Sequence, residues 1–161
     1  MIELPYRRDA AVAYARRWAL GRNPAYFDFD ALGGDCTNFV SQCLYAGAGV
    51  MNYTRETGWY YVNSSDRAAS WTGVEYFHRF LVSNRSVGPY ARETEQNRLL
   101  PGDIIQLGDG AGHFYHTLLV TETAPELRIA AHSFDALDRP LRTYSYSAAR
   151  YLHIAGVRAW G

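Results

Sequence analysis

The stretch that decides the fold is GGDCTNFVSQCLYAG, residues 33–47. Asp35 has a side chain typical of a helix N-cap, and Gly47 suits the left-handed position that follows a last helical turn. The apolar residues between them share one helical face, namely Val40, Cys43 and Leu44. The pattern predicts a helix that begins at Cys36 and packs its apolar stripe against a core.

Helical periodicity also appears on both sides of this stretch. Residues 8–20 place apolar side chains on one face and arginines on the other, and a Gly and an Asn-Pro pair follow them, which predicts an amphipathic opening helix. Thr72 and Glu75 have the spacing of a capping box, so a third helix is predicted over residues 73–82. Residues 48–70 have no period and are expected to form a long loop or a short hairpin.

The second half of the chain changes to the periodicity of strands. Short segments rich in β-branched and aromatic residues are separated by turn residues, and we expect strands over residues 103–107, 114–121, 127–133, 141–146 and 154–160. Helices followed by strands indicate the α+β class, with N-terminal helices packed on a C-terminal antiparallel sheet. A length of 161 residues without repeats or linkers favours a single domain, residues 1–161.

The composition excludes several classes of function. Sixteen basic and sixteen acidic side chains cancel, so no net field attracts nucleic acid, and we expect no nucleic-acid partner. All sixteen basic residues are Arg, which excludes lysine Schiff-base chemistry and a P-loop. No apolar run reaches the roughly 18 residues that span a bilayer. The charged start does not fit a signal peptide, so the chain as written is expected in the cytoplasm, or in the cell wall if a leader has been removed.

The two cysteines call for different explanations. They are seven residues apart on one predicted helix, about 10 Å along its axis, which is too far for a disulfide bond. Cys36 in the first helical turn would lie at the positive end of the helix dipole, which lowers a thiol pKa, and beside free amides that could bind an oxyanion. Cys36 is therefore a candidate nucleophile, with burial beneath the adjoining glycines as the alternative. Cys43 is expected in the core.

A thiol nucleophile needs a base from another element. His116 lies in the predicted strand 114–121, on the face that also carries Phe114, Leu118 and Val120. A histidine on an apolar face is commonly a core residue, but beside a helix-opening cysteine it fits the arrangement of cysteine peptidases, in which a third polar group orients the imidazole. His132 is the natural third group, and Asp135 is the alternative with the stronger charge.

Two further sets of residues have both a structural and a functional interpretation. His113 and His116 form an H-x-x-H pattern, but residues three apart on a strand face opposite sides and no zinc-spaced cysteine pair accompanies them, so we expect no metal. An aromatic cluster either lines a substrate groove or fills the core; it comprises Trp59, Tyr60, Tyr61 and Trp71.

Together these motifs resemble the putative amidase domain family. The motifs extend over nearly the whole chain: Asp35-Cys36-Thr37-Asn38-Phe39-Val40-Ser41-Gln42, Gly58-Trp59-Tyr60-Tyr61, Ser70-Trp71-Thr72, Pro101-Gly102-Asp103, His116-Thr117 and His132-Ser133-Phe134-Asp135. The first of them is the most specific. The family looks like a branch of the papain-like superfamily, which also contains NlpC-type and CHAP cell-wall hydrolases.

The resemblance implies a papain-like cysteine amidase or peptidase that needs no cofactor. Cys36 would attack an amide carbonyl, His116 would deliver a proton to the leaving amine, and His132 would be the third polar residue. Tyr26 is a candidate second donor to the oxyanion, beside the backbone amide of Cys36. By analogy with the superfamily, the substrate would be a bacterial cell-wall peptide or a peptidoglycan fragment. The alternatives are a peptide-binding module without turnover and an acyl transferase.

Overall fold

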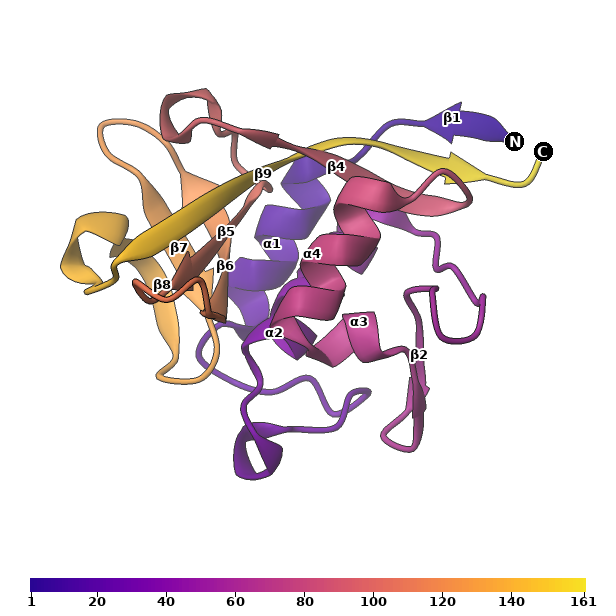
Figure 1. Ribbon diagram of the computed structural model, residues 1–161, viewed down its shortest axis with the longest axis horizontal. Coiled ribbons are helices and arrows are strands. Elements are labelled where there is room, and N and C mark those ends of the chain that lie inside the picture. Colours follow the sequence, from indigo (N-terminus) through magenta and orange to yellow (C-terminus); the bar gives the residue numbers. More distant parts are fainter.

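The computed structural model describes residues 1–161. The fold is α+β, as predicted, with four α-helices and a seven-stranded antiparallel sheet. Figure 1 shows the helices gathered on one side of this sheet and the two ends of the chain side by side at one edge. None of the helices is long and apolar enough to cross a membrane.

The three predicted helices are present, and a short fourth one precedes the last of them. Their bounds are α1 Arg8–Trp18, α2 Cys36–Ala48, α3 Ala69–Thr72 and α4 Val74–Ser83. The capping box expected at Thr72 and Glu75 is wrong: Thr72 ends α3, and Gly73 is the N-cap residue of α4 without a side-chain cap. The segment expected as a loop or hairpin does hold a hairpin, formed by β2 Tyr61–Asn63 and β3 Asp66–Arg67.

Helix α2 begins at Cys36 as predicted but ends later than expected. Its left-handed C-terminal residue is Gly49, with φ of 70°, and Gly47 lies inside the helix. A Cβ atom on Gly47 would come within 2.5 Å of the Tyr6 ring and 2.7 Å of the Arg7 carbonyl oxygen. The glycine is therefore required for close packing of the N-terminal segment on α2, and not for a turn.

The large sheet has the order β1-β9-β5-β6-β7-β8. Strands β1 and β5 pair along one edge of β9, and β4 pairs along the opposite edge. Its strands are β1 Ile2–Leu4, β4 Gly88–Thr94, β5 Ile104–Gly108, β6 Phe114–Glu122, β7 Arg128–Ala131, β8 Ala136–Pro140 and β9 Ala148–Ala159. Four of the five predicted strands are confirmed in type. The prediction of a strand over 141–146 is wrong, because the chain forms a 3₁₀ turn at Leu141–Thr143 and the strand lies before it.

Side chains of β6 alternate between two apolar clusters, one on each face of the sheet. Leu119 packs in the cluster beneath the helices, together with residues of α1, α2 and α4. Leu118 and Val120 pack in the second cluster, on the opposite face. By this alternation His116 shares the face of Leu118, as expected, and Thr117 faces α2. At the start of β6, His116 therefore lies on the face away from the helices, and Thr117 lies on the face that packs on α2.

Candidate active site

A pocket of about 240 Å³ lies at the N-terminus of α2. Three separate segments line it: the loop before α2, the start of β6, and the turn between β7 and β8. The lining residues are Gly33, Gly34, Cys36, Tyr115, His116, Ser133 and Phe134. The structure therefore brings Cys36 and His116 to one pocket, although no hydrogen bond joins their side chains.

The loop before α2 turns sharply at two glycines. Gly33 and Gly34 have φ of 104° and 116°, a region that residues with a side chain rarely occupy. The next residue, Asp35, donates its backbone N–H to the Ser133 hydroxyl at 3.0 Å. This hydrogen bond fixes the loop on the turn between β7 and β8, and so sets Cys36 beside that turn.

A pair of buried threonines fixes α2 on β6. The Thr37 and Thr117 hydroxyl oxygens lie 2.8 Å apart, and the Gln106 amide donates to the Thr117 hydroxyl at 3.2 Å. Cys36 and His116 are the residues immediately before these two threonines. The contact therefore fixes the place of the cysteine relative to the histidine.

Burial controls the charges of the two candidate catalytic groups. It raises the pKa of the Cys36 thiol, and the nearby Asp35 carboxylate adds to this, against opposing hydrogen bonds from the backbone of Thr117 and from Thr37. Burial also lowers the pKa of His116 to about 4, with a smaller effect from the Arg139 charge. The expected low Cys36 pKa is thus wrong, because desolvation outweighs the helix end. At neutral pH both groups are uncharged.

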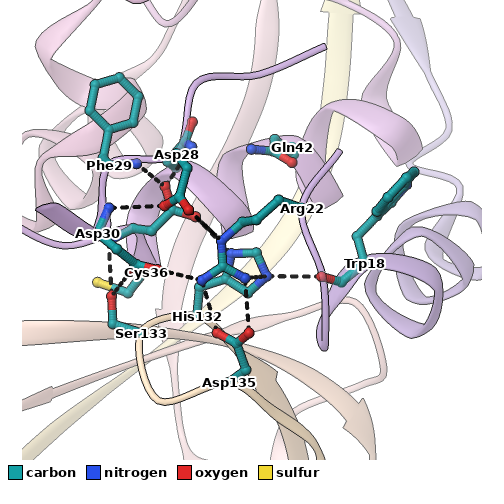
Figure 2. A network of polar contacts seen from close by, with 12 residues as sticks. Trp18, Arg22, Asp28, Phe29, Asp30, Cys36, Gln42, His132, Ser133 and Asp135 are labelled. Carbon is teal, nitrogen blue, oxygen red and sulfur yellow. Dashed lines mark hydrogen bonds and ion pairs between the residues drawn. The ribbon is translucent and has the colours of Figure 1, made fainter. Parts of the chain in front are cut away.

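His132 lies in a different environment from the one expected for a third catalytic residue. Its ring is buried and stacks on Phe39, with the ring centroids 4.0 Å apart. Its Nδ1 lies 2.7 Å from the Asp35 carboxylate and its Nε2 lies 2.9 Å from the Trp18 carbonyl oxygen. Figure 2 shows the contact between His132 and Trp18. Both ring nitrogens are thus engaged elsewhere, and His132 makes no hydrogen bond to His116.

Arg22 is the centre of the polar network around His132 (Figure 2). Its guanidinium contacts the carboxylates of Asp28 at 3.3 Å, Asp35 at 3.6 Å and Asp135 at 2.9 Å, and that of Asp30 as well. Asp135 is therefore paired with Arg22 and does not orient His116. The network joins the segment after α1, the start of α2 and the turn after β7, which are the segments around Cys36.

The aromatic residues proposed for a groove do not line the pocket. Trp59 and Trp71 are fully buried, and their indole N–H groups donate to side chains of α2. The groove interpretation is therefore wrong for both, and they belong to the core. Tyr60 is half-buried and packs on another tyrosine, with the ring centroids 5.6 Å apart. Tyr26 stacks on Trp71 at 6.0 Å and is not among the residues that line the pocket.

Three residues of the pocket wall were not singled out from the sequence. Ser133 and Phe134 directly follow His132, and Tyr115 directly precedes His116. Ser133 and Phe134 also belong to the His132-Ser133-Phe134-Asp135 motif of the resemblance, but nothing in the sequence marks any of the three as a pocket residue. Arg22 was also missed, although it is the basic residue nearest to the aspartate-rich segment 28–35.

Comparison with known proteins identifies relatives over most of the chain. A family model described as putative amidase domain matches residues 5–155. The chain is 40% identical over 119 residues to a Bacillus subtilis (strain 168) protein named Uncharacterized protein YhbB, an alignment that covers 71% of this chain. The chain spans about 37% of the length of that relative. No solved structure matches.

Proposed function

The chain belongs to the putative amidase domain family, and from this premise we propose that it hydrolyses an amide bond with Cys36 as nucleophile and His116 as base. Membership of the family suggests hydrolase activity. The observation that carries the proposal is that Cys36 and His116, from α2 and β6, line one pocket. A nucleophile and a base from different elements, facing one small pocket, are the minimal requirement for acyl transfer through a thioester.

The uncharged state of both groups sets the first step. As the Cys36 sulfur attacks the amide carbonyl, its proton passes to the His116 imidazole, and a tetrahedral oxyanion forms. The imidazolium then protonates the leaving amine as the C–N bond breaks, which leaves a thioester on Cys36. His116 next takes a proton from water as the water attacks the thioester. The imidazolium returns this proton to the Cys36 sulfur as the C–S bond breaks, so the carboxylic acid product leaves and the thiol is restored.

The oxyanion would be stabilised at the start of α2. The first backbone N–H groups of a helix have no intrahelical partner and carry the positive end of the helix dipole. In α2 these include the amides of Cys36 and Thr37. We therefore assign the oxyanion to these backbone groups in place of Tyr26, whose ring packs on Trp71.

The place of His132 changes the role proposed for it. Because it contacts Asp35, the residue before Cys36, it is proposed as a positioning residue that holds the start of α2. The same holds for Asp135, which acts through Arg22. Neither residue is proposed to touch the substrate.

The resemblance to papain-like hydrolases supports two more specific proposals, one on the domain and one on the substrate. The first is that residues 1–161 form one papain-like domain, since strands from both ends of the chain share one sheet. The second is that the substrate is a bacterial cell-wall peptide, on the analogy with NlpC-type and CHAP enzymes. Purified peptidoglycan is therefore the first substrate to test.

The test is the release of new amino groups from peptidoglycan and from a panel of peptides. We expect Cys36→Ala and His116→Ala to abolish release while the melting temperature stays within a few degrees of wild type. Cys43→Ala is the matched control, because Cys43 is the other free thiol and is fully buried. It should retain activity. Equal activity in wild type and Cys36→Ala would refute the proposed nucleophile.

A peptide-binding module without turnover is the second candidate function. The observation that favours it is that burial raises the pKa of Cys36 and no hydrogen bond joins its thiol to His116. Peptide binding by wild type without amine release from any substrate would support this alternative. A third outcome, transfer of the acyl group, would appear as a new amide product when an amine acceptor is added.

A further inference from the structure

We propose that Phe134 is a specificity residue, and that it selects substrates with an apolar, uncharged side chain next to the scissile amide, aromatic side chains best of all. This inference rests on the proposed hydrolysis at Cys36 and names the substrate class of the same pocket. It does not rest on the cell-wall analogy, because peptidoglycan peptides carry no aromatic side chain. It is carried by three features of the structure: the exposure of Phe134, the absence of charge on the pocket wall, and the size of the pocket.

Phe134 has an exposed apolar ring and an unfavourable backbone conformation, and no contact within the chain explains either feature. The residue is 93% exposed, on the turn between β7 and β8, and it lines the Cys36 pocket. Its φ of 58° lies in the left-handed region, which is disfavoured for a bulky residue. An exposed phenyl ring stabilises nothing within this chain. A ligand that covers the ring would explain why a phenylalanine stands there.

The wall of the pocket offers no ionised partner to a charged substrate group. Of the seven residues that line it, none is a carboxylate or a guanidinium, and His116 is uncharged at neutral pH. Charged groups do lie near this wall: Asp30 and Asp135 are paired with Arg22, Asp35 directly precedes Cys36, and the Arg139 charge acts on His116. The four carboxylates that face Arg22 outnumber the two guanidinium groups, Arg22 and Arg139, so the surplus charge beside the pocket is negative, which disfavours an acidic residue at this place.

The size of the pocket limits what enters it. A volume of about 240 Å³ is below the range of roughly 300–1,000 Å³ that is typical of sites for whole ligands. It therefore accepts the reacting amide and one neighbouring side chain. Tyr115, which is 45% exposed, supplies a second aromatic wall. An apolar side chain that packs on Phe134 and Tyr115 would bury apolar area on both.

The experiment measures amine release from acetylated tetrapeptide amides that differ at one residue beside the scissile bond, either Phe, Leu, Ala, Lys or Glu. For wild type we expect kcat/KM to be highest for Phe and at least tenfold lower for Glu. Phe134→Ala should raise KM for the Phe peptide about tenfold with kcat nearly unchanged, and change the Ala peptide less than twofold. Trp160→Ala, an exposed aromatic at the chain end on the far side from β7 and β8, is the matched control (Figure 1).

A second variant and a binding measurement complete the test. Phe134→Gly should lose the same discrimination with an unchanged or higher melting temperature, because glycine relieves the left-handed backbone. Binding of the same peptides to Cys36→Ala, measured by calorimetry, reports selectivity without turnover. If the Phe peptide is bound selectively, if this selectivity depends on Phe134, and if wild type releases no amine, the inference stands and the proposed hydrolysis is refuted. Turnover or binding indifferent to Phe134, a preference for Lys or Glu, or no binding at all would overturn the inference.

Discussion

Asp35 carries the sharpest stability prediction, because its buried carboxylate joins three segments around Cys36. One oxygen accepts hydrogen bonds from the Phe29 backbone N–H at 2.9 Å and the Asn38 amide at 2.8 Å. The other lies 2.7 Å from His132 Nδ1. Asp35→Ala removes the acceptor and leaves these buried groups without a partner. We expect the variant to fold less stably and to expose the Cys36 thiol.

The size of the effect follows from the three contacts. A hydrogen bond to a charged group contributes about 1.5–3 kcal/mol, and a buried donor left without its acceptor costs about 1–3 kcal/mol. Because the three contacts share one carboxylate, they do not add in full, and we expect a loss of about 4 kcal/mol in the free energy of unfolding. For a chain of this length that lowers the melting temperature by roughly 8–16 °C. Asp35→Asn keeps one acceptor oxygen and should lose about half as much.

Urea unfolding followed by tryptophan fluorescence measures the loss, since Trp59 and Trp71 are fully buried reporters of the core. Asp28→Ala is the matched control. The Asp28 carboxylate is 46% exposed and pairs with Arg22 at 3.3 Å, so its removal should cost about 1 kcal/mol or less. An Asp35→Ala variant within 1 kcal/mol of wild type would refute the reasoning that this carboxylate fixes the start of α2.

Three further predictions concern other parts of the molecule. Burial raises the pKa of the Cys36 thiol, so its alkylation by iodoacetamide should reach half the maximal rate only above pH 8.5. Peptide mapping measures this rate, and selective reaction of Cys36 near pH 7 would contradict the prediction. The pKa of His116 in the folded protein, about 4, lies below the value of about 6.5 in the unfolded chain, so protonation favours unfolding. Wild type should therefore lose up to about 3 kcal/mol of stability as the pH falls from 6.5 to 4. Denaturant titrations of His116→Ala should not show this loss. Asp103→Ala should cost about 3–5 kcal/mol in the same titrations, since its fully buried carboxylate lies within hydrogen-bond distance of four donors or ring nitrogens, and a loss below 1 kcal/mol would contradict that.

The parts of the fold that local chemistry determines could be predicted from the sequence. The start of α2 at Cys36 follows from the residues on either side of it, and β6 follows from its own alternation. Strand β4 was missed because its sequence, GPYARET, opens with Gly-Pro and carries two charges. It forms a strand because it pairs with the distant strand β9. Such pairing is a tertiary effect that propensity does not contain.

The candidate site shows the same limit. That Cys36 and His116 belong to suitable elements is visible in the sequence, but the contact that fixes them runs through Thr37 and Thr117, whose burial no local pattern indicates. Burial also decides the pKa of Cys36, against the sign that its place at a helix end suggests. Desolvation depends on the packed neighbours, so the sequence alone gives the wrong direction.

Strand β9 determines the order in which the sheet can be completed during synthesis. It pairs with β1, β4 and β5, and it follows all three in the chain. Strands β5 to β8 can form successive hairpins as they leave the ribosome, whereas β1 and β4 have no strand partner until β9 has been made. Both would expose unpaired edges in the nascent chain, the state in which strands associate with other chains. The segment around Cys36 is thus translated early, while the edge strands β1 and β4 are secured only after the last strand emerges.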